Sequence, residues 1–483
     1  MADVVYPPRL AQRVLALEAP GGEAAAVSLV APTITVPGEP FRLKLAVLDE
    51  LGYPSTEFDG AVMLRGPLAG AGEIEVPFAR GRPAVAHVAG VAIAADGLHR
   101  FQAEWDGGAH HSNPTCCTGR AASRIYWGDP HVHTVLSDCH PDRCRSLEFC
   151  YVAGKWLSGL EWVSAADHVS NGRGSLGKWR QQAAACELFD EPGIFATLPA
   201  YEASLKGGAG GDNNVYMLRW PDIFVDEYDQ GNIRTLCEKM SGKLSPEEFF
   251  VVPHHTTRTG KHGEIGDDIY PGPDWMPAVE IHSKWGTSEY RGNPNGLHEI
   301  HPGPSYAVDL LAKGLRLGFI GGTDTHTTLP AGHDRRNPGH INRPPGLTAV
   351  RAGELTREAI FRGIQSRNCY AASGERIYLE ADVAGARPGQ SIEWTDSKAP
   401  RCISVTAAAG GDIASVEIVR NGQAIHTRRG LSWKTAFDFT DGDDLTDSAL
   451  ASKDLGRFAY YYVRLTCSSG ARAWSSPVWL SIG

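Results

Sequence analysis

The stretch YWGDPHVHTVLSDCH, residues 126–140, decides how the middle of this chain folds. It places His131 and His133 two positions apart, and Asp138 follows five positions later. The preceding run RIYWGDP is typical of a buried strand, in which residues i and i+2 point to the same side. We therefore expect the two imidazoles to lie together at the end of this strand, where they can bind one metal ion.

Histidine and carboxylate side chains recur where later apolar runs end. The runs LEWVSAADH, IFATLPAYEAS, FFVVPHHT, AVEIHS and LGFIGGTDTH carry Asp167, His168, Glu202, His254, His255, Glu280, His282, Asp324 and His326. Thirteen of the 18 histidines lie between His131 and His340. Imidazole and carboxylate ligands together suit zinc, manganese or iron. Six strand ends with such groups indicate a metal site on a rigid scaffold.

The composition sets limits on the class of protein. A chain of 483 residues predicts two or three domains. The net charge of −10 argues against a nucleic-acid or membrane-surface binder. No apolar run approaches the roughly 18–20 residues of a membrane span, and residues 1–14 show no secretory signal. We therefore expect a cytoplasmic protein whose ten cysteines are reduced thiols.

The pattern of the chain changes twice, which predicts three domains. Residues 1–122 and 373–483 consist of short alternating runs between Pro and Gly clusters, as in β-sandwich-like domains. The pair Asn421–Gly422 predicts a hairpin in the second of them. Residues 123–372 alternate strands with helical stretches, which predicts a parallel sheet. About seven such units favour an α/β barrel, in which the carboxyl ends of the strands meet at one rim.

The ordered motifs HVHT, SD, DH, a single Glu, HH, EIH and GGTDTH resemble the polymerase-and-histidinol-phosphatase (PHP) family of metal-dependent hydrolases. The likeness covers residues 123–372 well and residues 373–483 moderately, and it is closest to a branch with flanking β-domains. It implies a distorted (β/α)7 PHP-type barrel that binds two or three divalent ions, Zn, Mn or Fe.

The resemblance also implies a role for each ligand. His131, His133 and Asp324 would hold the first ion, and Glu202 would bridge it to a second. His254 and His282 would complete the second, with His255 competing for the place of His254. Asp138, His168 and His326 would hold a third. Cys139 stands where the family has glycine after Asp138. The candidate catalytic groups are Asp324, His326 and Asp167, the last by orienting a ligand.

Such a site predicts hydrolysis by metal-activated water, and we expect a phosphoesterase that acts on a small anionic substrate. Four cations that follow two of the ligand strands are the candidate substrate-binding residues: Arg258, Lys261, Lys284 and Arg291. Two alternatives stay open. The same chemistry hydrolyses amides, lactones and carboxylic esters, and a barrel with a structural metal would suit a non-catalytic binding protein. The flanking β-domains also leave a homo-oligomer open.

Overall fold

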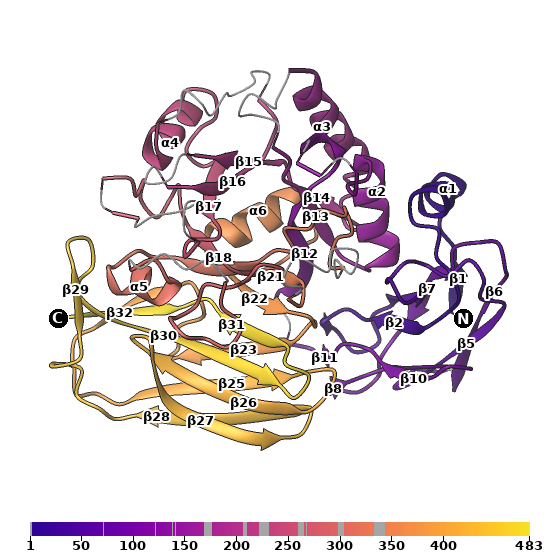
Figure 1. Ribbon diagram of the computed structural model, residues 1–483. Coiled ribbons are helices and arrows are strands. Elements are labelled where there is room, and N and C mark those ends of the chain that lie inside the picture. The colour runs from indigo at the N-terminus through magenta and orange to yellow at the C-terminus, as the bar shows by residue number, and fades with distance from the viewer. Residues whose placement is uncertain are drawn as a thin grey trace.

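The structure is a computed structural model that describes residues 2–70, 72–120, 122–137, 139–140, 142–168, 176–205, 210–221, 231–258, 265–266, 268–297, 304–332 and 343–483. Asp138 and Lys261, two of the predicted site residues, lie outside these ranges. Figure 1 shows three parts: the N-terminal strands, the middle part that carries most of the helices, and the C-terminal strands.

The N-terminal part contains two four-stranded sheets and one three-stranded sheet. Their elements are β1 Asp3–Val5, α1 Arg9–Glu18, β2 Ala26–Val30, β3 Ile34–Thr35, β4 Phe41–Leu48, β5 Gly60–Arg65, β6 Glu73–Phe78, β7 Val85–Val91, β8 Gly97–His99, β9 Gln102–Trp105, β10 Gly108–His111 and β11 Thr115–Cys117. The sheets have the orders β1-β7-β4-β2, β10-β9-β5-β6 and β3-β11-β8. Alternation explains the packing of β4, whose Leu43, Leu45 and Val47 are buried.

The middle part alternates strands with helices. Its elements are β12 Arg124–Val132, η1 Val135–Ser137, α2 Leu147–Val152, η2 Ala153–Leu157, β13 Trp162–Ala165, α3 Leu176–Phe189, β14 Ala196–Thr197, β15 Ala200–Ser204, β16 Asp212–Met217, α4 Ile233–Ser241, β17 Phe249–Pro253, β18 Ala278–Ser283, β19 Gly286–Thr287, α5 Ala307–Ala312, β20 Gly318–Gly321, β21 Gly346–Ala352, α6 Arg357–Gln365 and β22 Cys369–Ser373. The helix η1 is of the 3-10 type and η2 is a π-helix.

Mixed α/β structure in several sheets is confirmed, but the closed (β/α)7 barrel is not evident among the described residues. Regular pairing divides the middle strands into β14-β13-β12-β21-β22, β15-β16-β17 and β19-β18-β20. The strand β16 runs antiparallel to both of its neighbours. Only residues 205–211 connect β15 to β16, which is too short for the crossover that parallel strands require.

The C-terminal part continues the largest sheet of the middle part. Its elements are β23 Tyr378–Val383, β24 Ser391–Trp394, β25 Arg401–Ala408, β26 Ile413–Arg420, β27 Gln423–Leu431, β28 Lys434–Asp441, β29 Leu450–Ser452, β30 Gly456–Cys467, β31 Arg472–Ser475 and β32 Val478–Ile482. The strand β22 pairs with β31, so one sheet runs from β14 to β27. The domain boundaries 1–122, 123–372 and 373–483 stay predictions, and the last of them falls inside β22.

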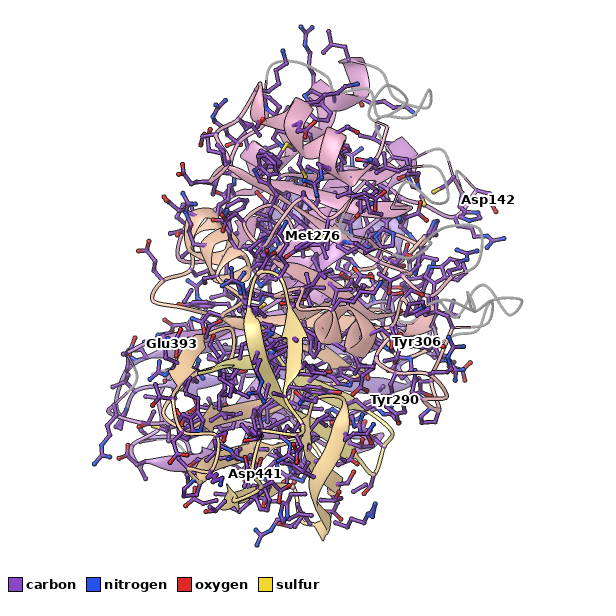
Figure 2. The ribbon with its side chains drawn as sticks, turned by 90° about the vertical axis from the view of Figure 1, so that its left-hand side faces the viewer. Asp142, Met276, Tyr290, Tyr306, Glu393 and Asp441 are labelled. Carbon is purple, nitrogen blue, oxygen red and sulfur yellow. The ribbon has the colours of Figure 1, made fainter. Side chains whose placement is uncertain are left out.

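The predicted hairpin at Asn421–Gly422 is confirmed. The two residues connect β26 to β27. Both have positive φ, 50° at Asn421 and 79° at Gly422, which is the backbone of a type I′ turn. In Figure 2, Asp441 marks the C-terminal strands and Met276 the middle part.

The buried carboxylate of Glu289 joins the middle part to the C-terminal strands. We call Glu289 and the side chains that contact it the Glu289 pocket. Glu289 is fully buried. Its Oε1 accepts hydrogen bonds from Tyr462 Oη at 2.7 Å and from Arg464 Nη1 at 2.5 Å, and its Oε2 accepts one from Trp474 Nε1 at 2.8 Å. Arg464 also donates to Glu417. Every charge in the pocket therefore has a partner within the protein.

In the described part of the chain, no helix combines the length and the apolar character that crossing a bilayer requires.

Candidate metal centre

His131 and His133 lie at the end of β12 with both rings buried. The Nδ1 of His131 lies 3.1 Å from Glu280 Oε2, and the Nδ1 of His133 lies 2.9 Å from Ser137 Oγ. These contacts turn both Nε2 atoms towards one another, at a separation of 3.2 Å. Two imidazole nitrogens at this distance both present lone pairs unless a proton or a metal ion lies between them.

Two buried carboxylates face the same imidazoles. Asp324 Oδ1 lies 3.1 Å from His133 Nε2, and its Oδ2 lies 2.8 Å from His255 Nε2. Glu202 Oε2 lies 3.1 Å from His133 Nε2, and its Oε1 lies 3.3 Å from His254 Nε2. Each carboxylate therefore uses its two oxygens on two different histidines. This is the arrangement that a carboxylate bridging two ions requires.

We call the whole set the histidine cluster: His131, His133, His168, Glu202, His254, His255, Asp324 and His326. It forms overlapping groups whose ligand atoms lie within 4.8 Å of one another: His131–His133–Asp324, His131–Glu202–His254, His133–His168–Glu202, His254–His255–Asp324, and His133–Cys139–His326. The sequence prediction that distant strand ends meet at one place is therefore consistent with the geometry, while the role of each ligand stays a prediction.

The fit to a metal ion can be judged from His254. Its ring is buried, and among the described residues neither ring nitrogen makes a hydrogen bond, although Glu202 Oε1 lies 3.3 Å from Nε2. Burying a polar group without a partner costs roughly 1–3 kcal/mol. A divalent ion bound through Nε2, beside Glu202, would satisfy the ring, so the residues present fit such a group.

When no metal ion is bound, protons on imidazoles of the histidine cluster balance the negative charge of its carboxylates. Burial lowers the pKa of His133, but the hydrogen bonds and charges of Asp324 and Glu202 outweigh it and raise the pKa to about 10. Burial raises the pKa of Asp324, yet the charge of His131 and the contacts with His133 and His255 hold it well below its usual value. Metal binding would replace these protons, because ligand imidazoles must be neutral.

Two residues of the histidine cluster have an unusual backbone. His255 has φ of 55° and Asp324 has φ of 50°, in the left-handed region that non-glycine residues rarely adopt. Such conformations cost on the order of 1–3 kcal/mol each and gather at functional sites. Here they direct the two side chains towards each other, since His255 Nε2 and Asp324 Oδ2 are in contact.

Asp167 and Asp129 support the cluster from behind. Asp167 accepts hydrogen bonds from Thr134 N at 2.6 Å, Thr134 Oγ1 at 2.7 Å and Ser137 Oγ at 2.6 Å, and Ser137 in turn contacts His133. Asp129 accepts from the backbone N–H of Thr323 at 3.0 Å and from its hydroxyl at 2.7 Å. The geometry gives Asp167 an orienting place. Asp129 and Ser137 were not predicted. The contacts of Asp129 are with backbone N–H and hydroxyl groups, and those of Ser137 are with the side chains of His133 and Asp167. Neither set leaves a sequence motif.

His282 is not part of the histidine cluster. Its Nδ1 lies 2.8 Å from Thr287 Oγ1, its Nε2 lies 2.8 Å from the carbonyl of Pro344, and burial lowers its pKa to about 4. The pairing of β18 with β20 shifts register between Glu280 and His282. This β-bulge breaks the rule that residues i and i+2 share a face. Glu280, which the sequence named at the same strand end without a ligand role, contacts His131 instead.

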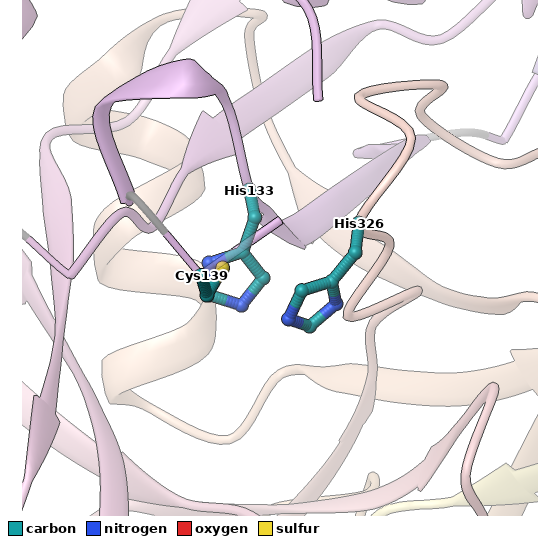
Figure 3. Close-up of side chains that lie close together, drawn as sticks. All are labelled: His133, Cys139 and His326. Atoms are coloured by element: carbon teal, nitrogen blue, oxygen red, sulfur yellow. The ribbon is translucent and has the colours of Figure 1, made fainter. Parts of the chain in front are cut away.

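The outer side of the cluster carries His168, Cys139 and His326. His168 Nε2 lies 3.5 Å from Glu202 Oε2, and its ring stacks on His133 with centroids 5.0 Å apart. Figure 3 shows Cys139 beside His133 and His326. In the sequence, Cys139 stands where the resembled family has glycine. The third ligand expected there, Asp138, lies outside the described residues.

Two of the predicted substrate-binding cations lie beside the cluster. Lys284 is buried, and its Nζ lies 2.9 Å from His326 Nδ1. The cations of Lys284 and Arg258 both lie over the ring of Trp285, 5.1 and 4.9 Å from its centroid. Arg291 is exposed and lies over Tyr306 instead. Lys284 and Arg258 therefore form the positive edge of the site, and Arg291 does not join them at Trp285.

Comparisons with known proteins give a family model and several relatives, each of which matches part of this chain. A family model described as a protein of unknown function, DUF3604, matches residues 340–415. An uncharacterised protein of Chlamydia pneumoniae is 25% identical over 382 residues, which cover 77% of this chain and 60% of that protein. One from Chlamydia trachomatis is 30% identical over 255 residues, covering 50% of this chain and 40% of that protein. The chain thus spans about half the length of these relatives.

One solved structure comes from Bacteroides vulgatus, a two-domain protein containing a predicted PHP-like metal-dependent phosphoesterase. It is 12% identical, covers 71% of this chain and 91% of that chain, and superposes with a TM-score of 0.37. A superposition at this score carries no argument about the fold or the chemistry. The buried groups of the histidine cluster are what indicates that this chain can bind divalent metal ions.

Proposed function

We propose that this chain is a metal-dependent hydrolase and that its substrate is a small anionic phosphoester. The observation that carries the proposal is the excess of acceptors in the histidine cluster. Imidazoles and carboxylates from β12, β15, β17 and the loop after β20 face one another at 2.8 to 3.3 Å. Divalent cations satisfy such a set better than protons do, because each cation accepts several lone pairs at once.

Two or three divalent ions, Zn, Mn or Fe, would activate water near neutral pH and stabilise negative charge on the attacked group. His131, His133 and Asp324 would hold the first ion. Glu202 would bridge the first ion to a second ion, which His254 would hold. His255 belongs to a group with both His254 and Asp324. Glu280 and the Ser137–Asp167 pair keep the Nε2 atoms of His131 and His133 pointing inward.

The positive edge favours an anionic substrate over a neutral one. Lys284 is a buried cation beside His326, and Arg258 shares the ring of Trp285 with it. Arginine contacts phosphate oxygens in pairs, and lysine adds a point charge. Hydrolysis of a phosphoester is therefore preferred to hydrolysis of an amide, lactone or carboxylic ester.

We also infer a distorted barrel fold and a cytoplasmic location for this enzyme. Single backbone hydrogen bonds join the separate sheets near the cluster: Glu202 N donates to Asp167 O at 3.1 Å, and Asp324 N donates to His131 O at 2.8 Å. These links support a strongly distorted PHP-type barrel. All ten cysteines are free, which supports a reducing cytoplasmic compartment.

The test combines metal content with activity. Protein purified without added metal is analysed for bound elements and then assayed on phosphomonoesters, phosphodiesters, an amide and a lactone. We expect at least one bound transition metal per chain, activity on a phosphoester, and loss of that activity on chelation. His131→Ala and Asp324→Ala should be inactive, whereas His111→Ala, on the exposed strand β10, should be fully active.

Three outcomes contradict the proposal in different ways. Full activity in the metal-free protein excludes the mechanism. Turnover of only the amide or the lactone replaces the substrate class. Bound metal without turnover of any substrate indicates a non-catalytic binding protein.

A further inference from the structure

A thiol belongs to the outer side of the histidine cluster. The ligand atoms of His133, Cys139 and His326 all lie within 4.8 Å of one another. Figure 3 shows the three side chains converging, His133 and Cys139 from the two ends of one loop and His326 from another. Two ligands of a tetrahedral zinc ion, each about 2.0–2.3 Å from the metal, lie roughly 3.5 Å apart, so the spacing suits one ion.

The two loops are fastened to each other, so the approach of Cys139 to His326 is built into the fold. Cys144 Sγ donates to the carbonyl of His326 at 3.3 Å. The backbone N–H of Arg145 donates to Thr328 Oγ1 at 2.7 Å. Within the first loop, Cys144 N donates to the carbonyl of His140 at 2.9 Å. Cys139 is thereby held on a short turn opposite His326.

The histidines present the correct atoms. His326 Nδ1 lies 3.1 Å from the carbonyl oxygen of Asp324, and an N–H donated to that oxygen leaves the lone pair of Nε2 for a metal ion. His133 presents its Nε2 to the inner ligands Asp324 and Glu202, so Cys139 and His326 are the members of this group that face the outer ion. The ring of His140 lies 4.7 Å from that of His326 and offers a further imidazole. Thiolate with imidazole is a ligand set typical of zinc.

We propose that Cys139 is a metal ligand, and that it holds an ion at the outer side of the cluster together with His326. The thiol proton leaves to solvent when the bond to the ion forms. A thiolate favours zinc over manganese or magnesium, so this position selects the softer metal. The inference rests on the proposed function, because it assigns one ligand within the same metal centre.

Cobalt(II) provides a probe that reports on the thiolate without an activity assay. The full chain is stripped with a chelator, loaded with cobalt(II), and examined by absorption spectroscopy. We expect a near-ultraviolet thiolate-to-cobalt charge-transfer band in the unmodified protein. Cys139→Ser should lose the band, while Cys402→Ser, with an exposed thiol in β25, should keep it.

A second measurement uses the unmodified protein, and so does not depend on the variant folding. Alkylation of Cys139 by iodoacetamide, followed by peptide mapping, should slow about tenfold or more when zinc is added. Zinc affinity should fall about 100-fold in Cys139→Ser, while manganese affinity should change less than about threefold.

The outcomes separate this inference from the proposed function. Bound cobalt without a charge-transfer band, or a Cys139 alkylation rate that zinc does not change, overturns the thiolate ligand and leaves the metal hydrolase standing. Absence of bound metal under all conditions overturns both.

Discussion

The histidine cluster and the Glu289 pocket are both buried and charged, but their hydrogen-bond inventories differ. In the Glu289 pocket, three donors from Tyr462, Arg464 and Trp474 meet two carboxylate oxygens. In the histidine cluster, His131 Nε2 and His133 Nε2 lie 3.2 Å apart and also face carboxylate oxygens, so lone pairs meet wherever no proton or metal ion lies between these atoms. The first group is complete within the protein, whereas the second requires protons or metal ions between its ligand atoms.

This difference separates a structural charge from a functional one. A buried ion pair whose partners are all present fixes how two parts of a chain pack. Burying polar groups with unused lone pairs costs free energy that folding alone does not offset. Binding of a cation to those lone pairs offsets this cost. The predictions below test whether the two sites behave as these inventories require.

The largest effect is expected at Glu202. Glu202→Gln keeps the shape but removes the charge that faces His133 and His254. Turnover of the phosphoester should fall by about 10²–10³-fold, the range for losing one preorganised electrostatic group. Elemental analysis should show fewer ions per chain. Glu393→Gln, on the exposed face of β24, is the matched control and should change neither value. Normal turnover in Glu202→Gln would remove Glu202 from the site.

Glu289→Ala should lower the free energy of unfolding and leave the metal content unchanged. The substitution leaves Arg464, Tyr462 and Trp474 without their shared acceptor, which costs about 3–5 kcal/mol. Urea denaturation measures the loss, and elemental analysis of the folded fraction should show unchanged metal content. The control is Glu417→Ala, which removes the half-buried partner of Arg464 and should cost less than about 1 kcal/mol. Equal costs for the two variants would contradict the comparison.

Glu280→Gln tests how the cluster is oriented. Glu280 Oε2 contacts His131 Nδ1, so its charge keeps Nε2 as the metal-facing atom. Losing such a supporting carboxylate typically lowers metal affinity 10–100-fold. Competition with a chromogenic zinc chelator measures the change. His282→Gln, two residues further along β18, should leave zinc affinity unchanged, because both ring nitrogens of His282 contact other groups. A larger loss in His282→Gln would restore His282 as a ligand.

The smallest effect on stability is expected at His87. This residue is a third kind of buried group, because it has neither the complete set of partners of the Glu289 pocket nor a place in the metal centre. Its ring stacks on Trp156 with centroids 4.1 Å apart, and burial with the nearby charge of Lys44 lowers its pKa to about 3. The fold therefore favours the neutral ring. Its contribution to stability is complete above the unfolded pKa of about 6.5 and is lost as the pH falls towards 3.

The free energy of unfolding should consequently drop by roughly 1–2 kcal/mol between pH 7 and pH 5 on account of His87. His87→Phe keeps the stacking and should abolish this part of the pH dependence, as measured by urea midpoints at both pH values. His426→Phe, on the C-terminal strand β27, is the control and should retain it. The same acid loss in His87→Phe would assign the effect to another group.

The sequence predicted the cluster better than the scaffold. His131 and His133 were identified because an HxH pair after an apolar run has a simple geometric meaning. The ligand role was assigned to His282 rather than to Glu280, because no local pattern announces the β-bulge between them. The antiparallel strand β16 and the pairing of β22 with β31 depend on contacts between residues far apart in the chain, which periodicity does not encode.

The pairing of β22 with β31 has a consequence for how this protein is made. Phe319 N, in the strand that leads to Asp324, donates to Ser476 Oγ, a residue 157 positions downstream. A nascent chain that has emerged only through residue 372 therefore exposes the unpaired edge of β22 and lacks the Ser476 hydroxyl that accepts a hydrogen bond from β20. Contacts of such long range slow folding, so we expect the strand that leads to Asp324 to reach its final packing only after the C-terminal strands have paired.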